Sequence, residues 1–503
     1  MRLLPVSLLL ACVDPKGEDL PAPLLVPAPG WMEHGEGSYT LDGDTIISVS
    51  ADGAAAADQL AEALRPATGL ALEVVVGGDG GIALELDPSL DLPPEAYTLD
   101  VFSDGVTIAA SDLAGLFYGT QTFRQLLPAE AASSSRQADP LWRVPVVSIE
   151  DEPRFPWRGA MIDVARHFFG PEELERQIDL LALHKFNRLH LHLTDDQGWR
   201  IEIRSWPLLA EVGGSTEVGG GPGGYYTQDE YVALVEYAAE RHVTVVPEID
   251  FPGHAHAALA SYGELNESGE PLDPYTGAPV ISTPLWLEGP ATSGFVADVL
   301  GEVAALTPGA WLHVGGDEAI GVSSAQYGAF IADMQAVVEA EGKTLVGWDE
   351  IGVVPLAPPF LTQHWLDEDN ARDAVAQGAQ LVASPAEHAY LDMEQSTSAD
   401  YGQTWAGRID VQDAYDWEPV PVGLDDADVV GIEGAMWSEY IDSRERMDFM
   451  LWPRLAAHAE VGWAAADARD WDDFRVRLGA HGERLEVLGV GYYASRQVEW
   501  VEP

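Results

Sequence analysis

The stretch NRLHLHLTDD, residues 187–196, alternates apolar and polar residues and ends in two carboxylates. Runs of this kind, short, rich in β-forming residues and closed by polar or charged ones, occur eight times after residue 150, usually followed by a helical pattern. Short buried strands that alternate with helices predict a parallel sheet, and eight of them predict a closed (β/α)8 TIM barrel. The runs are RGAMIDVA (158–165), NRLHLHLTDD (187–196), VTVVPEID (243–250), WLHVGGDE (311–318), TLVGWDE (344–350), FLTQHWLD (360–367), QLVASPAE (380–387) and VVGIEGAMWSE (429–439).

The segments between these runs carry ordinary helix-start signals. Pro171 opens PEELERQIDLLALHKF, and Thr227 with Glu230 forms a capping-box pattern before YVALVEYAAERH. The fifth and seventh connections lack a clear helical pattern, which predicts an irregular barrel. A doubly wound open sheet is the alternative, but no G-x-G-x-x-G motif follows an early strand.

The remaining sequence divides the chain into further parts. Strand-like runs such as TIISVS and YTLDVFSDGVTIAAS, mixed with the helical pattern GAAAADQLAEALRPATG, predict a small α+β domain before the barrel. The polar stretch AASSSRQADP at 131–140 marks its end. We therefore expect a signal at 1–12, a tether at 13–31, the α+β domain at 32–150, the barrel at 151–475 and a C-terminal extension at 476–503.

The first residues, MRLLPVSLLLACVD, contain one Arg and an apolar run that reaches the single cysteine, Cys12. The run resembles a short bacterial lipoprotein signal with LLAC as its lipobox, which predicts an exported protein anchored through a lipid on Cys12, in the periplasm or at the cell surface. An ordinary signal or an inert apolar start is the alternative. No later run approaches the roughly 18 apolar residues of a membrane span.

Charge narrows the range of partners. The sequence has 26 Lys and Arg against 83 Asp and Glu, a formal charge of −57. Such an excess repels nucleic acid and anionic lipid, keeps the protein soluble, and is compatible with a neutral or cationic substrate or a salty medium. An acidic solvated surface without any special partner is the simpler interpretation.

The carboxyl ends of the predicted strands are rich in carboxylates, His, Arg and Trp, and poor in Ser or Cys nucleophiles. Aromatic faces stack on sugar rings, and charged groups bind sugar hydroxyls. Asp317 and Glu318 follow Gly315 and Gly316, which let the backbone turn so that both carboxylates can converge on a ligand. Like charges so close raise one pKa, so we expect Glu318 to be a protonated general acid and Asp317 its charged neighbour. Capping of the next helix is the alternative.

Seven motifs, in order, carry a resemblance to a known family. The sequence DVARHFF from Asp163, HLHLTDDQGWR from His190, EIDFPGHAHA from Glu248, HVGGDEA from His313, GWDEI from Gly347, YLDM from Tyr390 and WSEY from Trp437 resembles the β-N-acetylhexosaminidases of glycoside hydrolase family 20. The resemblance covers about residues 150 to 465, and the preceding domain looks like the α+β module that these enzymes often carry.

The resemblance implies an exo-acting, retaining enzyme without a metal or organic cofactor, in which the substrate's acetamido oxygen attacks the anomeric carbon. It implies that Glu318 is the general acid and later base, and that Asp317 orients the acetamide. The substrate would be a terminal GlcNAc or GalNAc of chitooligosaccharides or other glycans. The other positions that it matches are Arg166 and Glu439 as binders of hydroxyls, Trp348, Trp365 and Trp437 as aromatic walls, Tyr390 and Asp392 at the acetamide, and Asp195, His254 and, more weakly, Asp250 as supporting polar groups.

Several alternatives remain open at this point. Trp365 could be packing, Arg166 a structural ion-pair partner, Tyr390 a buried aromatic and His254 a core histidine. The H-x-H of His190 and His192 could bind a metal, with His254, His313 and Asp317 as further ligands. The protein could also release a disaccharide, or bind surface glycans without cleaving them. The GlcNAc or GalNAc preference and the oligomeric state stay open.

Overall fold

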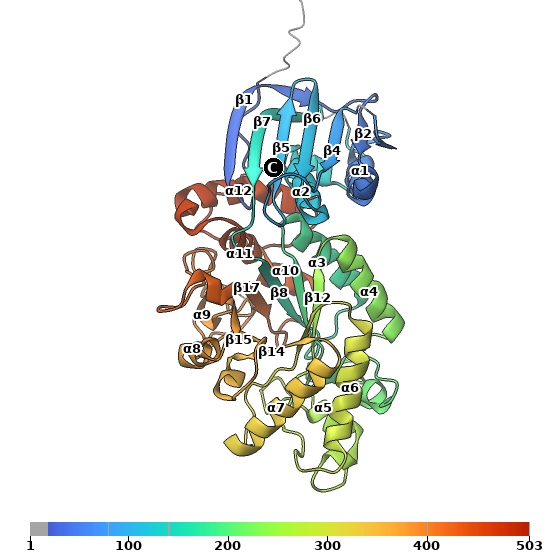
Figure 1. Ribbon diagram of the computed structural model, residues 1–503, viewed down its shortest axis with the longest axis vertical. Coiled ribbons are helices and arrows are strands. Elements are labelled where there is room, and N and C mark those ends of the chain that lie inside the picture. The colour runs from blue at the N-terminus through green and yellow to red at the C-terminus, as the bar shows by residue number, and fades with distance from the viewer. Residues whose placement is uncertain (1–18, 79, 139–140, 400, 502–503) are drawn as a thin grey trace, which may run out of the picture. The chain divides into compact units, whose positions relative to one another are not determined.

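The computed structural model describes residues 19–78, 80–138, 141–399 and 401–501 (Figure 1). These residues form two compact units. Residues 19–25 and 29–152 make the first, and residues 26–28 and 153–501 make the second. The predicted signal at 1–12 and its Cys12 lie outside the described residues.

The first unit is a seven-stranded mixed sheet with two helices, in the order β1-β7-β5-β6-β4-β2-β3. Alternate residues of its strands are buried, as in a sheet that is covered on one face. Helices α1 and α2 touch each other and both pack on the sheet, so they cover the same face (Figure 1). This confirms the predicted α+β domain. The elements are β1 (Trp31–Thr40), β2 (Ile46–Val49), η1 (Ala51–Gly53), α1 (Ala54–Thr68), β3 (Glu73–Val76), β4 (Ile82–Leu86), β5 (Tyr97–Phe102), β6 (Gly105–Ala110), α2 (Leu113–Leu126), η2 (Ala129–Ala132) and β7 (Arg143–Asp151).

The second unit is built on a closed barrel of eight parallel strands. All eight predicted runs form its strands, and β17 pairs with β8 to close the ring. The predicted barrel is therefore confirmed, and the open-sheet alternative is wrong. The strands are β8 (Trp157–Asp163), β9 (Arg188–His192), β12 (Thr244–Glu248), β13 (Trp311–His313), β14 (Thr344–Trp348), β15 (Leu361–His364), β16 (Gln380–Ala383) and β17 (Val429–Met436).

Helices connect most of these strands. The capping box that Thr227 and Glu230 predict is present at the start of α4. As expected, the fifth connection, between β14 and β15, holds only a short 3-10 helix, η6 (Asp349–Val353), and the seventh holds the four-residue α9 and a long loop. The helices are α3 (Pro171–Leu183), α4 (Gln228–Glu240), α5 (His256–Ser261), α6 (Thr292–Leu306), α7 (Ser324–Ala340), α8 (Glu368–Ala376), α9 (Ala386–Ala389), α10 (Arg444–Leu451), α11 (Arg454–Trp463) and α12 (Trp471–Val487), with a two-stranded ribbon of β10 (Thr194–Asp195) and β11 (Gly198–Trp199).

Two predicted segment boundaries fall inside packed structure. Within the expected tether, residues 26–28 belong to the barrel unit, where the backbone N–H of Ala28 donates to Glu460 at 2.9 Å. The expected boundary at residue 475 lies within α12. His481 of that helix contacts His184 of the barrel unit, Nε2 to Nε2 at 2.9 Å, and both rings are buried.

The barrel interior is polar as well as apolar. Two buried glutamates, Glu248 and Glu433, organise it. Glu248 bonds to His190 and His192 at 3.0 and 2.5 Å and accepts from the Trp348 indole at 2.9 Å. Glu433 bonds to His190 at 2.7 Å and also accepts from a tryptophan and a glutamine. These contacts balance each buried charge. They also hold the side chains inside the barrel in fixed positions below the carboxyl ends of the strands.

Among the described residues, no helix is both long enough and apolar enough to cross a membrane.

Candidate active site

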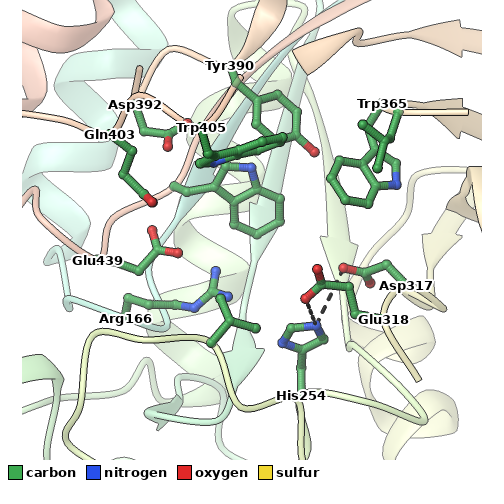
Figure 2. A pocket seen from close by; sticks show the side chains of 13 residues that line it. Arg166, His254, Asp317, Glu318, Trp365, Tyr390, Asp392, Gln403, Trp405 and Glu439 are labelled. Carbon is green, nitrogen blue, oxygen red and sulfur yellow. Dashed lines mark ion pairs between the residues drawn. The ribbon is translucent and has the colours of Figure 1, made fainter. Parts of the chain in front are cut away.

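A cavity of about 370 Å³ opens at the carboxyl ends of the barrel strands, where the connecting loops meet (Figure 2). Its volume is in the range of sites that hold small ligands. The side chains that line it are Arg166, His254, Val280, Asp317, Glu318, Trp365, Leu366, Tyr390, Asp392, Gln403, Trp405, Trp437 and Glu439.

The Asp317–Glu318 pair follows β13 through a turn that requires its two glycines. Gly315 has a φ of +68°, and a Cβ there would lie 1.7 Å from an oxygen of Asp250. Gly316 has a φ of +99°, and its N–H donates to the same Asp250 carboxylate at 3.3 Å. Glu318 itself adopts a φ of +42°. The left-handed turn places both carboxylates on the cavity instead of on opposite faces of a strand, as the sequence predicted.

His254 links the two carboxylates. Its Nε2 lies 3.5 Å from Asp317 and 3.6 Å from Glu318, while its Nδ1 bonds to Asp195 at 3.3 Å (Figure 2). Burial alone would lower the pKa of His254, but Asp195, Asp250 and Asp317 raise it well above its usual value. His254 is therefore a buried cation between the supporting Asp195 and the two carboxylates.

The pKa of Asp317, which the sequence predicted to be the charged neighbour of the general acid, is raised. Burial chiefly, and then the charges of Glu248 and Glu318, raise the pKa of Asp317 to about 6, although His254 opposes the shift. The two carboxylates also differ in exposure. The Asp317 side chain is 12% exposed, whereas that of Glu318 is 40% exposed and reaches toward the mouth of the cavity. One Asp317 oxygen, Oδ1, is buried without a hydrogen-bond partner among the described residues.

Arg166 lies on the side of the cavity opposite Asp317 and Glu318, together with Asp392 and Glu439 (Figure 2). Arg166 pairs with Asp195 at 2.7 Å and with Asp163 at 3.1 Å, and its guanidinium lies 5.0 Å from the centre of the Trp437 ring. Burial would lower its pKa, but the charges of Asp195, Asp163 and Glu439 raise it well above normal. Arg166 is thus an ion-pair partner, as one interpretation predicted, and its side chain also lines the cavity.

Asp392 and Glu439 are buried on the side of the cavity away from Asp317, with Glu439 next to Arg166 and Asp392 nearer to Gln403 (Figure 2). Within the part of the chain that the structure describes, neither oxygen of Asp392 has a hydrogen-bond partner, and Oε2 of Glu439 has none. Burial is the main cause that raises the pKa of both carboxyls. For Asp392, the negative charge of Glu439 raises the pKa further. Buried polar atoms are normally satisfied, so these oxygens are matched to a ligand that brings several hydroxyl groups.

Aromatic rings form the walls between these two ends. Trp365 and Tyr390 lie nearly parallel, with ring centres 6.0 Å apart and an interplanar angle of 7°. Trp405 stands edge-on to both rings, and Trp437 lies 5.9 Å from Tyr390. A box of this kind offers flat apolar faces to a pyranose ring and its substituents.

Three predicted positions lie behind the cavity. Asp195 reaches the site through Arg166 and His254. Trp348 is buried, donates to Glu248 and packs behind Trp437, with ring centres 5.5 Å apart, instead of lining the cavity itself. Asp250 supports the Gly315–Gly316 turn.

Four lining residues were not anticipated from the sequence: Val280, Leu366, Gln403 and Trp405. Leu366 directly follows Trp365 at the end of β15, so its position at a strand end was a usable signal. Gln403 and Trp405 lie in the long seventh connection, which has no periodic pattern to place them.

The metal alternative does not fit the hydrogen bonding of the H-x-H histidines. Both ring nitrogens of His190 bond to carboxylates, at 2.7 and 3.0 Å, and so do both of His192, at 2.5 and 2.9 Å. Burial opposes protonation, but the glutamates raise the pKa of His190 to about 9 and that of His192 to about 10. A metal needs a free lone pair on neutral imidazole, so these rings suit a role as hydrogen-bonded cations.

The chain is similar to known proteins along most of its length. The profile "Glycosyl hydrolase family 20, catalytic domain" matches residues 155–327 and 321–466, and "Glycosyl hydrolase family 20, domain 2" matches residues 22–152. The chain is 40% identical over 499 residues to a β-N-acetylhexosaminidase of Cellulomonas fimi, covering 96% of this chain and 98% of that protein.

Solved structures give the same answer. A family 20 β-N-acetylhexosaminidase of Streptomyces coelicolor is 45% identical with a TM-score of 0.92, covering 96% of this chain and 100% of that one. A mutant β-hexosaminidase of Streptomyces plicatus in complex with the product GlcNAc is 45% identical with a TM-score of 0.93, covering 97% and 100%. The chain therefore belongs to glycoside hydrolase family 20 and is a glycosidase.

Proposed function

We propose that this family 20 β-N-acetylhexosaminidase removes a single terminal GlcNAc or GalNAc from the non-reducing end of a glycan. The reaction retains the anomeric configuration, and the substrate's own acetamido group is the nucleophile. Similarity to the enzymes named above supports the hexosaminidase activity, and the geometry of the cavity supports the finer points.

One observation carries the mechanism. Asp317 and Glu318 both face Nε2 of His254, at 3.5 and 3.6 Å, so they approach the cavity from the same side (Figure 2). A retaining enzyme with a protein nucleophile needs its two carboxylates on opposite sides of the scissile bond. A nucleophile supplied by the substrate removes that need and leaves both carboxylates with distinct tasks.

In the first step the acetamide oxygen attacks the anomeric carbon, and the bond to the leaving oxygen breaks. Glu318 gives its proton to that oxygen, while Asp317 accepts a hydrogen bond from the acetamide N–H, which becomes positively charged as the oxazolinium ring forms. In the second step the Glu318 carboxylate takes a proton from water. The resulting hydroxide attacks the same carbon and reopens the ring with net retention. The exposed Glu318 suits the side from which leaving group and water come, and the buried Asp317 suits the acetamide.

Release of one sugar at a time fits the closed end of the cavity. Arg166, Asp392 and Glu439 line the cavity on the side opposite Glu318 and offer charged partners to the hydroxyls of a terminal ring (Figure 2). A disaccharide-releasing enzyme would need further room beyond these residues. The volume of about 370 Å³ suits a single ring with its N-acetyl group.

The test is a panel of aryl β-glycosides of GlcNAc, GalNAc, glucose and an N-acetylated disaccharide. We expect hydrolysis of the monosaccharide N-acetyl glycosides, an initial β-anomer by NMR, and a poor rate with the glucoside. Glu318→Gln should lose hydrolysis of substrates with poor leaving groups. A good rate with the glucoside would contradict the mechanism, and binding without turnover would favour a glycan-binding protein.

We also propose that the enzyme is exported and anchored through a lipid on Cys12. The apolar run that ends in LLAC supports this location. The acidic composition fits chitin fragments that carry free amino groups. Labelling with a radioactive fatty acid in a bacterial host should mark the wild-type chain and not Cys12→Ala, and equal labelling of both would refute the anchor.

A further inference from the structure

A second pair of adjacent carboxyls, Asp349 and Glu350, lies next to the site. The pair begins η6, directly after β14. The neighbouring strand β15 leads directly into Trp365, and β14 pairs with β15 up to Trp348 and Gln363. Two strand ends that lie side by side therefore bring the Asp349–Glu350 pair against the tryptophan that forms a wall of the cavity.

Asp349 holds the backbone that carries this tryptophan. Its Oδ2 accepts from the backbone N–H groups of Trp365, Leu366 and Asp367 at 3.1, 3.0 and 3.0 Å. The same oxygen bonds to the ring of His364 at 3.2 Å. One buried carboxylate thus fixes the start of the loop after β15, including both of its cavity-lining residues.

Glu350 holds the ring of the same residue. The indole N–H of Trp365 donates to Oε2 of Glu350 at 3.1 Å, and the Trp365 side chain is almost wholly buried. An indole has one polar atom, so this bond, together with packing against Tyr390 and Trp405, fixes how the ring is turned about its side-chain torsions. Glu350 does not line the cavity, and it acts on the cavity through Trp365.

Glu350 also lies near the charges of the site. Burial first, and then the charges of Asp317 and Asp349, raise the pKa of Glu350 to about 8. Near neutral pH its carboxyl is therefore mostly protonated, which leaves Asp317 as the charged group of the two. A neutral acid at this position can accept from the indole without adding a second negative charge beside the developing oxazolinium.

Trp365 and Tyr390 define the recess beside Asp317. Their rings lie nearly parallel, 6.0 Å apart, on the side of the cavity that also carries Asp317 (Figure 2). Under the proposed function this is where the acetamide sits, since Asp317 can accept from its N–H and Tyr390 can donate to its oxygen. The methyl end of the acyl group must then fit against the Trp365 wall.

We propose that Glu350 is a positioning residue that determines specificity: by holding the Trp365 indole it sets how large an N-acyl group the recess accepts. This inference rests on the proposed substrate-assisted function. Loss of the bond frees the indole to turn, so the acetamide loses alignment for attack while larger acyl groups gain room. Discrimination between acyl groups should fall together with the rate on the N-acetyl substrate.

The experiment compares kcat and KM of five forms on aryl β-glucosaminides with N-acetyl, N-propanoyl and N-butanoyl groups. The forms are the wild type, Glu350→Ala, Glu350→Gln, Trp365→Phe and the double variant Glu350→Ala with Trp365→Phe. Glu339→Ala, an exposed site on α7, serves as the matched control and should behave as wild type. Thermal unfolding of each form checks that it folds.

We expect Glu350→Ala to lower kcat/KM on the N-acetyl substrate by about 10- to 100-fold, the cost of one lost buried hydrogen bond. Its ratio of N-propanoyl to N-acetyl activity should rise by at least about 5-fold, a change within the reach of one methylene group. Trp365→Phe, which lacks the indole N–H, should give a similar change, and the double variant should be no worse than either single one. Glu350→Gln keeps a neutral acceptor and should restore most of the activity and selectivity.

The outcomes separate this inference from the proposed function. If the wild type cleaves a glucoside without an N-acyl group equally well, the substrate-assisted mechanism itself fails. If the wild type requires the N-acyl group but Glu350→Ala keeps the same acyl-size preference, or the two single changes add in the double variant, the positioning role of Glu350 is refuted.

Discussion

Replacing Asp317 by Asn removes a charge while it keeps the shape of the side chain and one acceptor oxygen. In the structure this side chain is 12% exposed, and its Oδ2 lies 3.5 Å from His254. At such a site an effective dielectric near 20 gives about 4 kcal/mol between unit charges at about 4 Å. Protonated His254 already offsets part of the negative charge, so we expect a loss of about 10²- to 10³-fold in kcat.

The same charge predicts a pH profile. Burial raises the pKa of Asp317 to about 6, so the carboxyl is ionised above pH 6 and protonated below it. Because the anion is the active form, kcat/KM of the wild type should fall about tenfold per pH unit below pH 6. Asp317→Asn has no carboxyl to titrate, so this acid limb should disappear and leave a low, flatter profile.

The assay is release of 4-nitrophenol from its N-acetyl-β-glucosaminide between pH 4 and 9, at constant ionic strength. Asp333→Asn, an exposed position on α7, is the matched control for loss of one negative charge. A loss of less than about tenfold in Asp317→Asn, or an acid limb that persists in that variant, would refute the assignment of Asp317 as the charged partner of the acetamide.

Three further outcomes are expected. Arg166→Met removes the cation that pairs with Asp195 at 2.7 Å and with Asp163 at 3.1 Å, and leaves Asp195 with only His192 and His254, so activity should fall at least about 10²-fold and unfolding free energy by about 3 to 5 kcal/mol, measured by denaturant titration; an unchanged midpoint would contradict the buried ion pair. Burial lowers the pKa of His184 to about 4 and lowers that of His481 well below its usual value, so the stability contributed by the two neutral rings should be full above pH 6.5 and decline as pH falls from about 6.5 toward 4. His481→Leu should flatten this decline in thermal unfolding scans, and an unaltered slope would refute it. Dialysis against a chelator should leave kcat unchanged, because the ring nitrogens of His190 already bond to carboxylates; loss with recovery on adding zinc would reopen the metal alternative.

The sequence predicted the barrel because its strands carry a strong local pattern. Each strand is a short apolar run closed by polar residues, and these closing residues meet at one end of a parallel barrel. Asp317, Glu318, Arg166 and Glu439 could therefore be proposed before any coordinates, since each stands within a few residues of a strand end. The resemblance then supplied a role for each of them.

Other features depend on tertiary structure and left no local signal. Trp405 lies in a loop without periodicity, and only its packing against Trp365 and Tyr390 identifies it as part of the site. The raised pKa of Asp317 was not predicted, because it depends on how much of that side chain water can reach. Glu350 was visible in the motif GWDEI, but its bond to Trp365 joins two different strand ends.

The hydrogen-bonded glutamates and histidines buried inside the barrel limit which substitutions the chain can accept during evolution. Glu248 contacts three histidines and a tryptophan at once, so replacing it by an apolar residue would leave the buried cations His190 and His192 without this partner, at a cost of several kcal/mol. Any lineage that alters one member must alter its neighbours in nearly the same step, or pass through an ancestor that folds poorly. Sequence differences between relatives should therefore concentrate in the loops around the mouth of the cavity. The buried glutamates and histidines below the cavity, which do not contact the sugar, should change little.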